Sequence, residues 1–353
     1  MLARLWPAAL IAFGLLAWTA CASDSDIEPL ETRRAGQSEE LGPPLSLAEV
    51  RYWAYQIQGL DRVGAVQALV DSHYDLVVIE PTRTIVGSED FDSQDVVERI
   101  KGSANSLGTG TKLVLAYVDI GEAEAYRTYW QDDWQAPELG QRGNPDFLVT
   151  LDPDGWSGNF PVAYWDQRWK EIVIYGKGSL LDLVLEDGFD GIYLDWVGAF
   201  DDLSVMEAAR GAGVDPAEEM IAFIREIREY AAERRPGFLI IAQNGADLLD
   251  DHPQYLDIID GIAQEDLSFQ GEADTDWEDE ESGDIRQERD YSQYLADVLR
   301  RYVERGVPTF CVQYARVPEN IEKALRDAEE VGCVPYMTLT PLDRLTETPL
   351  PGY

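Results

Sequence analysis

Two carboxylates stand directly at the ends of short apolar segments, and these positions suit acid–base or nucleophilic chemistry. Asp195 ends the run GIYLD at 191–195, and Glu265 follows the run IIDGIAQ at 258–264. An Asp at such a point can simply cap a turn. Glutamate is a poor turn former, so its place after an apolar run needs another reason. We therefore predict that Asp195 and Glu265 act as a catalytic pair.

Other apolar segments of the same kind also end in carboxylate, amide or aromatic side chains. This set suits the hydrolysis of glycosidic bonds, in which two carboxyl groups do the chemistry while rings stack on sugars and amides bind hydroxyls. It would equally suit a protein that binds sugar without cleaving it. Glu122 also fits the first turn of a helix, and Trp165 also fits a core. The residues predicted to bind substrate are Tyr55, Glu80, Arg83, Asp119, Glu122, Trp165, Trp196, Asn244 and Tyr314.

Histidine and cysteine are absent from these positions. His73 and His252 lie far apart in the sequence and lack metal-ligand spacing. We therefore expect no metal and no cofactor, and a Ser-His-Asp hydrolase is disfavoured. We expect Cys311 and Cys333, in separate predicted strands, to be buried free thiols rather than a bridge.

The pattern of short apolar runs and amphipathic stretches indicates the elements that position these residues. Near-continuous apolar runs are typical of parallel strands that are covered on both faces. We predict an α/β fold, a single-domain (β/α)8 TIM barrel whose active site lies at the carboxyl ends of the strands. A doubly wound sheet is the alternative, although no glycine-rich phosphate motif follows the first strand. The predicted strands are 52–58, 76–80, 112–118, 191–195, 238–243, 258–264, 308–313 and 334–338.

The predicted helices alternate with these strands. Two stretches interrupt the alternation: 121–158 has no helical or strand period, and 271–284 is a very acidic insert. An acidic loop is expected just before residue 215. A long irregular segment inside a compact domain is usually functional. The predicted helices are 61–72, 93–107, 168–186, 215–234, 291–305 and 321–331.

The amino-terminal residues have the pattern of an export signal. Arg4 precedes an apolar run and small residues follow it, which predicts a signal peptide over 1–22. Cys21 also fits a bacterial lipoprotein box, so lipidation there and free secretion both stay open. In either case the protein is expected outside the cytoplasm. We predict a flexible acidic tether over 23–47, the barrel over 48–345 and a carboxyl-terminal tail over 346–353.

The formal net charge of −39 limits the possible partners. Such a surface repels nucleic acid, and contact with a membrane is expected through a lipid anchor alone. The acidity either serves solubility in a salty habitat or attracts a cationic substrate. We expect the protein to be a monomer.

Five sequence motifs together resemble one known family. DGIYLD (190–195) resembles its DGxYLD hallmark, and DGIAQED (260–266) resembles DGIxxED. Three further motifs match in order: WAYQIQ (53–58), AYVDIGEAE (116–124) and IAQNG (241–245). The chain thus resembles glycoside hydrolase family 114, the endo-α-1,4-polygalactosaminidases and related extracellular barrels, from about residue 51 to 340.

The resemblance implies a TIM barrel that cleaves galactosamine-containing exopolysaccharide. It implies Asp195 as nucleophile and Glu265 as acid/base, which are the residues that the ends of the apolar runs had already indicated. Asp119 stands where the family pattern has serine, and Trp196 begins a less polar run than usual. Both departures bear on substrate choice. A polysaccharide-binding lipoprotein without activity and a glycosidase for a neutral sugar remain the alternatives.

Overall fold

A computed structural model describes residues 41–347 of the chain. The predicted signal peptide, the lipidation site Cys21 and most of the predicted tether lie outside the described residues, as do 348–353. Within 41–347, no helix has both the length and the apolar character needed to cross a membrane.

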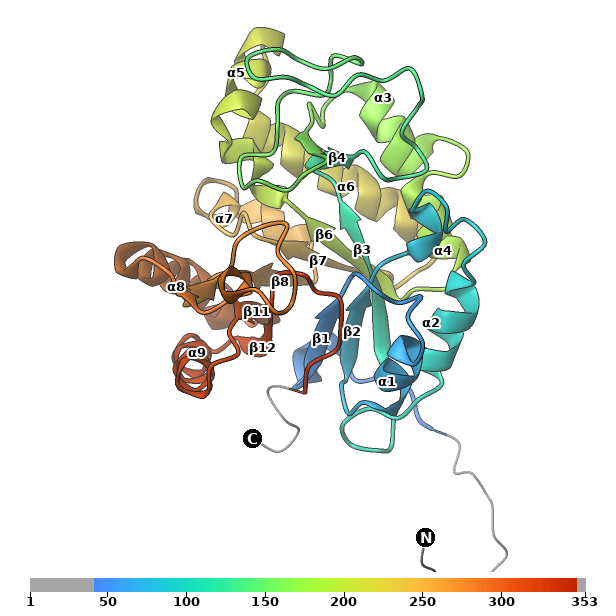
Figure 1. Ribbon diagram of the computed structural model, residues 1–353, viewed down its shortest axis with the longest axis vertical. Helices are drawn as coiled ribbons and strands as arrows, with labels where there is room; N and C mark the ends of the chain where they lie inside the picture. Colours follow the sequence, from blue (N-terminus) through green and yellow to red (C-terminus); the bar gives the residue numbers. More distant parts are fainter. Residues whose placement is uncertain (1–40, 348–353) are drawn as a thin grey trace, which may run out of the picture. The chain divides into compact units, whose positions relative to one another are not determined.

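Eight parallel strands form the centre of the protein (Figure 1). Their order in the sheet is β1-β2-β3-β6-β7-β8-β11-β12, and the indole N–H of Trp53 in β1 donates to the carbonyl of Val334 in β12 at 2.9 Å. The sheet therefore curls into a nearly closed barrel, which confirms the predicted single-domain (β/α)8 TIM barrel. The strands are β1 (Trp53–Gln56), β2 (Leu76–Ile79), β3 (Leu113–Asp119), β6 (Gly191–Asp195), β7 (Leu239–Gln243), β8 (Gly261–Gln264), β11 (Thr309–Tyr314) and β12 (Val334–Thr338).

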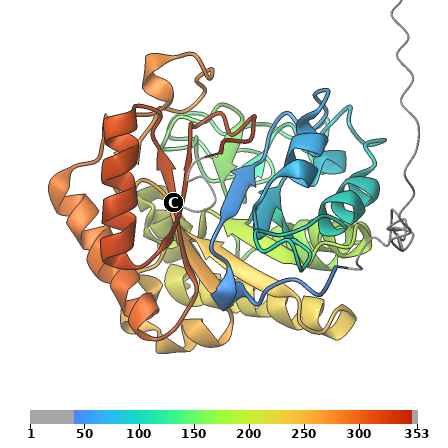
Figure 2. The same cartoon turned by 90° about the horizontal axis from the view of Figure 1, so that it is seen from below.

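Helices surround the barrel (Figure 2). Asp92, Asp202 and Asp215 each cap the helix that follows by accepting hydrogen bonds from backbone N–H groups of its first turn. The helices are α1 (Ala65–Asp71), α2 (Ser93–Lys101), α3 (Gln167–Lys170), α4 (Leu180–Glu186), α5 (Leu203–Ala212), α6 (Pro216–Arg234), α7 (Leu248–Asp251), α8 (Arg289–Glu304) and α9 (Pro318–Val331).

Two small antiparallel pairs organise the long loops at the carboxyl ends of the strands. In the loop after β3, β4 (Glu122–Glu124) pairs with β5 (Asn159–Pro161). In the loop after β8, β9 (Phe269–Gln270) pairs with β10 (Ile285–Arg286). The segments predicted to be irregular and acidic are thus attached to the barrel by short ladders.

Aromatic rings fill the barrel interior. Trp53, Tyr55 and Tyr193 are buried, with ring centroids 5.1–6.3 Å apart, and Phe310 meets Trp53 edge-on at 5.3 Å. Such contacts add to the burial of large apolar surfaces. The interior is therefore a packed core, and the open space lies above it at the carboxyl ends of the strands.

Two helix predictions were wrong in detail. The predicted helix 168–186 is divided into α3, a π-helical turn (Glu171–Tyr175) and α4. The chain leaves the helical path between the π-helical turn and α4, where Gly178 adopts a left-handed φ of 72°. The predicted acidic loop before residue 215 contains α5, whose apolar positions Val205 and Ala209 are buried. The acidic residues at the start of this segment suggested a loop, but Asp202 among them caps the first turn of α5.

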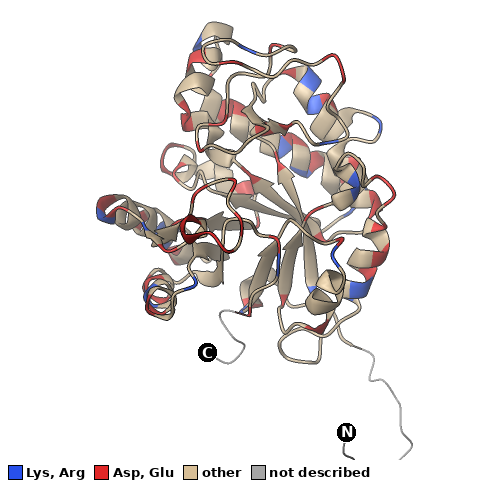
Figure 3. Cartoon of the chain, in the orientation of Figure 1, with Lys and Arg blue, Asp and Glu red and all other residues tan. Residues whose placement is uncertain are grey.

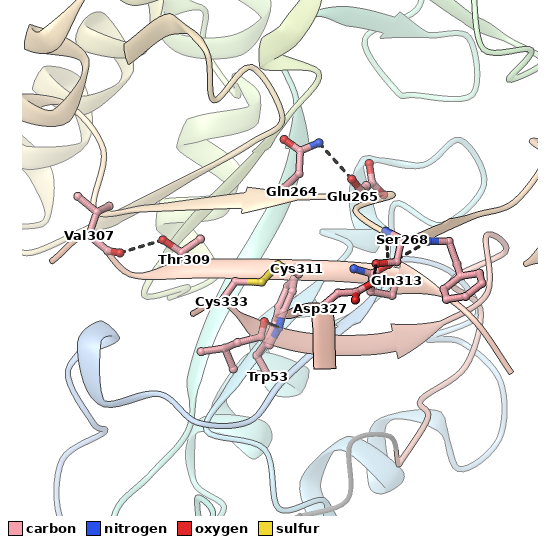
Figure 4. The surroundings of a disulfide bond; sticks show 12 residues. Trp53, Gln264, Glu265, Ser268, Val307, Thr309, Cys311, Gln313, Asp327 and Cys333 are labelled. Atoms are coloured by element: carbon pink, nitrogen blue, oxygen red, sulfur yellow. Dashed lines mark hydrogen bonds between the residues drawn. A yellow bond between two sulfur atoms is a disulfide. The ribbon is translucent and has the colours of Figure 1, made fainter. Parts of the chain in front are cut away.

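The expectation of free thiols was also wrong, because Cys311 and Cys333 form a disulfide (Figure 4). Cys311 lies in β11 and Cys333 directly precedes β12, and these strands are neighbours in the barrel. The pairing of β11 with β12 thus brings the two cysteines to 6.0 Å at Cα although they are 22 positions apart in sequence.

The described part of the predicted tether contacts the barrel. The backbone N–H of Gly42 donates to the carbonyl of Thr109 at 2.8 Å, and Leu47 is buried in the core. At the other end, Thr346 accepts a hydrogen bond from the Tyr74 hydroxyl. The packed body therefore includes residues on both sides of the predicted limits 48 and 345.

Reduction of the disulfide should destabilise the fold. Opening a loop of this length costs about 2–4 kcal/mol of unfolding free energy. Denaturant unfolding with and without reductant measures the change. The double variant Cys311→Ala/Cys333→Ala is the control, since its stability should not respond to reductant. If reductant lowers the free energy of unfolding equally in both proteins, the disulfide between Cys311 and Cys333 would be contradicted.

Candidate active site

Three neighbouring strands end in the same way. Asp195 ends β6, Gln243 ends β7 and Glu265 directly follows β8. Each is followed by a non-glycine residue in the left-handed region: Trp196 at φ 51°, Asn244 at φ 61° and Asp266 at φ 60°. Such conformations cost of order 1–3 kcal/mol and gather at functional sites.

A single amide nitrogen joins the two predicted catalytic carboxylates. Nε2 of Gln243 donates to Oδ1 of Asp195 and to Oε2 of Glu265, at 2.7 Å in each case. The two acceptor oxygens therefore lie at most twice that distance apart, about 5.4 Å. Since Gln243 is 1% exposed, this arrangement is held inside the protein rather than at a mobile surface.

Further donors fix each carboxylate. The Tyr117 hydroxyl donates to Oδ2 of Asp195 at 2.6 Å, and the backbone N–H of Trp196 donates to its Oδ1 at 2.7 Å. The Tyr314 hydroxyl donates to Oε1 of Glu265. Nδ2 of Asn244 donates to its Oε2 at 3.2 Å. Both carboxylates are thus oriented before any substrate arrives.

The two carboxylates have different electrostatic surroundings. Burial, followed by the charge of Asp195, raises the pKa of Glu265 to about 7. Burial also raises the pKa of Asp195, but the hydrogen bonds from Tyr117, Trp196 and Gln243 oppose that rise by favouring the ionised form. The pair therefore favours a proton on Glu265 and a negative charge on Asp195, which is the division of labour that acid catalysis requires.

Additional carboxyl groups crowd this end of the barrel. Oδ1 of Asp119 accepts the backbone N–H groups of Gly121 and Glu122 at 2.9 and 2.8 Å. Burial, and then the charge of Asp195, raises the pKa of Asp119 well above its usual range. Burial, and then the charge of Asp119, does the same for Glu122, whose carboxyl is hydrogen-bonded to that of Asp152. The site therefore concentrates carboxyl groups with few basic side chains beside them, and burial favours their protonated forms.

A buried arginine supports the floor of the site. Arg127 is 2% exposed and its guanidinium pairs with Glu80 and Glu124. The same guanidinium donates to the Thr84 hydroxyl at 2.8 Å. Glu80 borders the cleft, but its carboxylate is already paired. Buried ion pairs need this kind of complete hydrogen bonding to offset desolvation.

The predicted catalytic pair, Asp195 and Glu265, lines a cleft of about 1450 Å³. Two loops meet beside it, where the backbone N–H of Ser157 donates to Oδ2 of Asp274 at 3.0 Å. Among the described residues that line the cleft, Arg62 is the only basic residue, and its guanidinium forms an ion pair with Asp343. Figure 3 shows acidic residues in red on these loops. The lining carboxylates are those of Asp61, Glu80, Asp119, Glu122, Asp152, Asp154, Asp195, Asp201, Asp202, Asp247, Glu265, Asp266, Glu272, Asp274, Asp276 and Asp343.

The structure brings most, but not all, of the predicted substrate-binding residues into this cleft. Arg83 lies elsewhere and binds Asp187 at 2.9 Å. Trp165 packs edge-on against Tyr164 and borders a separate small pocket. The predicted residues that do line the cleft are Tyr55, Glu80, Asp119, Glu122, Trp196, Asn244 and Tyr314.

Several residues of the site were missed by sequence reasoning. Tyr117 and Gln243 lie inside the quoted motifs. Gln243 ends β7, and that position was the signal that could have found it, whereas Tyr117 lies two residues before the end of β3. Asp154, which accepts a hydrogen bond from the Trp196 indole, lies in the segment without a period. Among residues 41–347 no three His, Cys, Asp or Glu side chains are grouped so as to hold a metal ion.

The fold is a (β/α)8 barrel, and the comparison with protein families assigns it to the glycoside hydrolases. The model of glycoside hydrolase family GH114 matches residues 36–350, and the chain belongs to that family. The chain is 29% identical over 338 residues to an uncharacterized protein of Deinococcus radiodurans. The aligned region covers 94% of this chain and 96% of that protein.

Solved structures show the same fold. The glycoside hydrolase domain of PelA from Pseudomonas aeruginosa has a TM-score of 0.56 at 16% identity, covering 84% of this chain and 97% of that one. Aspergillus fumigatus Ega3 in complex with galactosamine has a TM-score of 0.56 at 14% identity, covering 88% and 98%.

Glycoside hydrolysis by this site should decline as the pH rises through about 7, where Glu265 loses the proton that an acid must supply. Initial rates across the neutral pH range measure this decline, which is the alkaline limb of the pH profile of kcat/KM. Tyr314→Phe removes a hydrogen bond that lowers the pKa of Glu265, so its limb should move to higher pH. A rate that is flat through neutral pH in both proteins would contradict the assignment of Glu265 as the acid.

Proposed function

We propose that this protein is an endo-acting glycoside hydrolase that cleaves α-1,4-linked galactosamine-containing polysaccharide. The observation that carries the proposal is the oriented Asp195–Glu265 pair inside a cleft whose lining is dominated by carboxylates. Membership of family GH114 supports the reaction class. The galactosamine bound to Ega3, a structural neighbour, supports the choice of sugar.

In this mechanism Glu265 first acts as the acid. It donates its proton to the glycosidic oxygen while Oδ2 or Oδ1 of Asp195 attacks the anomeric carbon, so the C–O bond to the leaving sugar breaks as a bond to Asp195 forms. Glu265, now ionised, takes a proton from water, and that water displaces Asp195 from the sugar. The enzyme returns to its first state. The pKa of Glu265, raised to about 7, suits both the donation and the removal of a proton.

The distance between the carboxylates favours retention of anomeric configuration. Retaining enzymes hold their two carboxyl groups roughly 5–5.5 Å apart, whereas inverting enzymes leave about 6.5–9.5 Å for a water molecule. The shared Gln243 amide limits the two oxygens to about 5.4 Å. This limit falls within the range of retaining enzymes, and it supports direct attack of Asp195 on the sugar.

The acidic cleft supports a cationic substrate. Asp119 and Glu122 carry raised pKa values because buried carboxylates face one another without a base. An ammonium group of a galactosamine residue would supply the missing positive charge and let these carboxyls ionise. The field of the cleft would also attract such a polymer from solution.

We further propose that the enzyme acts outside the cytoplasm, either secreted or anchored by a lipid on Cys21.

Removal of either carboxylate should abolish hydrolysis. Asp195→Asn and Glu265→Gln should each lower kcat on an α-1,4-galactosamine polymer by roughly a thousandfold or more, measured as released reducing ends. Arg83→Gln is the control, since Arg83 lies outside the cleft. Near-wild-type rates in both variants would refute the pair. Polymer retention without hydrolysis by the wild type would instead indicate a binding protein.

The first product should carry the α configuration of the substrate. Proton NMR during early turnover reads the anomer before mutarotation. A β product would mean inversion, and the mechanism through a covalent Asp195 intermediate would then be wrong.

Added salt should also raise KM for the cationic polymer by screening its attraction to the cleft, whereas KM for a neutral substrate should not change.

A further inference from the structure

An aromatic pair at the edge of the cleft has no part in the chemistry at Asp195 and Glu265. Tyr291 and Tyr294 lie three residues apart near the start of α8, so they share one face of the helix. Their ring centroids are 6.2 Å apart with the planes inclined by 22°, and both rings line the cleft. They are 49% and 43% exposed. Broad ring surface is therefore available to a ligand inside the cavity that holds the catalytic pair.

The helix beneath the pair is firmly packed. Leu295 and Val298, one turn further along the same side, are 5% and 1% exposed and also border the cleft. The α8 turn that carries the two rings is thus anchored by core contacts. A platform held in this way loses little conformational freedom when it binds.

Carboxylates surround the aromatic pair. The Tyr294 hydroxyl donates a hydrogen bond to Asp247. Burial raises the pKa of Tyr291, and the charges of Asp266, Asp247, Asp154 and Asp201 raise it further, in that order. These four carboxylates all line the cleft. The surroundings thus combine flat aromatic faces with several carboxyl groups.

That combination selects a particular ligand chemistry. The C–H face of a sugar ring packs on an aromatic face, and an ammonium group is attracted both by the ring face and by nearby carboxylates. A neutral sugar would use only the packing of its C–H face on the ring, and a simple cation would use only the attraction to the ring face and the carboxylates. The position also fits a polymer, because Tyr291 and Tyr294 line the same cleft as Glu265.

We propose that Tyr291 and Tyr294, together with Asp247, form a subsite that binds a cationic amino-sugar residue of the polymer at a distance from the bond being cleaved. The proposal deepens the proposed function and takes its substrate class from it. The subsite would hold the chain in the cleft through several sugars, and its contribution would appear in binding and KM rather than in the chemical step.

Binding is tested without hydrolysis, in the Glu265→Gln background. Affinity for an α-1,4-galactosamine polymer is measured calorimetrically at low salt. Adding Tyr291→Ala and Tyr294→Ala should weaken binding by roughly 3- to 30-fold. Tyr175→Ala is the matched control, because Tyr175 is also half-exposed (41%) and also donates to a carboxylate, that of Glu226, but lies outside the cleft. Thermal unfolding verifies that all variants fold.

A kinetic measurement in the otherwise wild-type enzyme separates a subsite from a structural effect. The Tyr291→Ala/Tyr294→Ala enzyme should show a raised KM with little change in kcat, and the loss should be greater on the polymer than on short oligomers. Asp247→Asn should reduce the salt dependence of KM.

The outcomes distinguish this proposal from the proposed function. Unchanged polymer affinity in the double variant, or a loss equal to that of Tyr175→Ala, overturns the subsite even if the wild type hydrolyses the polymer. A selective loss of affinity supports the subsite even if the wild type proves inactive, in which case only the hydrolytic function fails.

Discussion

The site depends on one interaction, the hydrogen bonds from a single Gln243 amide nitrogen to both Asp195 and Glu265. Two buried carboxylates repel each other, and a donor placed between them offsets that repulsion while it fixes their separation. Burial and the charge of Asp195 favour a proton on Glu265, and they outweigh the hydrogen bonds from Tyr314 and Asn244, which favour its ionised form. The Gln243 amide thus fixes the distance between the two carboxylates, on which the proposed retaining mechanism depends.

The barrel makes this interaction possible. β6, β7 and β8 are adjacent and parallel, so the groups at their carboxyl ends meet at one place. A left-handed residue after each group, such as Trp196 after Asp195, turns the chain sharply as the strand ends. Negative charge that is costly to folding has been concentrated where a cationic polymer would be attracted.

Much of the fold was predictable because strand burial leaves a clear trace in the sequence. The eight apolar runs overlap the eight barrel strands, and Asp195 and Glu265 were found from their positions at the ends of such runs. Contacts between distant segments left no such trace. The Cys311 disulfide, the ion pairs of Arg127 and the location of Arg83 outside the cleft depend on which elements become neighbours, and sequence periodicity does not determine this.

The most direct test of this account is the kinetic and pH behaviour of Gln243→Met, which keeps the side-chain volume but removes the shared donor. The account predicts that kcat/KM on a galactosamine polymer falls roughly a hundredfold or more, in a protein that still folds. It also predicts that the alkaline limb moves to higher pH, because the two carboxylates then repel without compensation. A near-wild-type rate with an unmoved limb would show that the amide does not organise the pair, and would contradict the central claim.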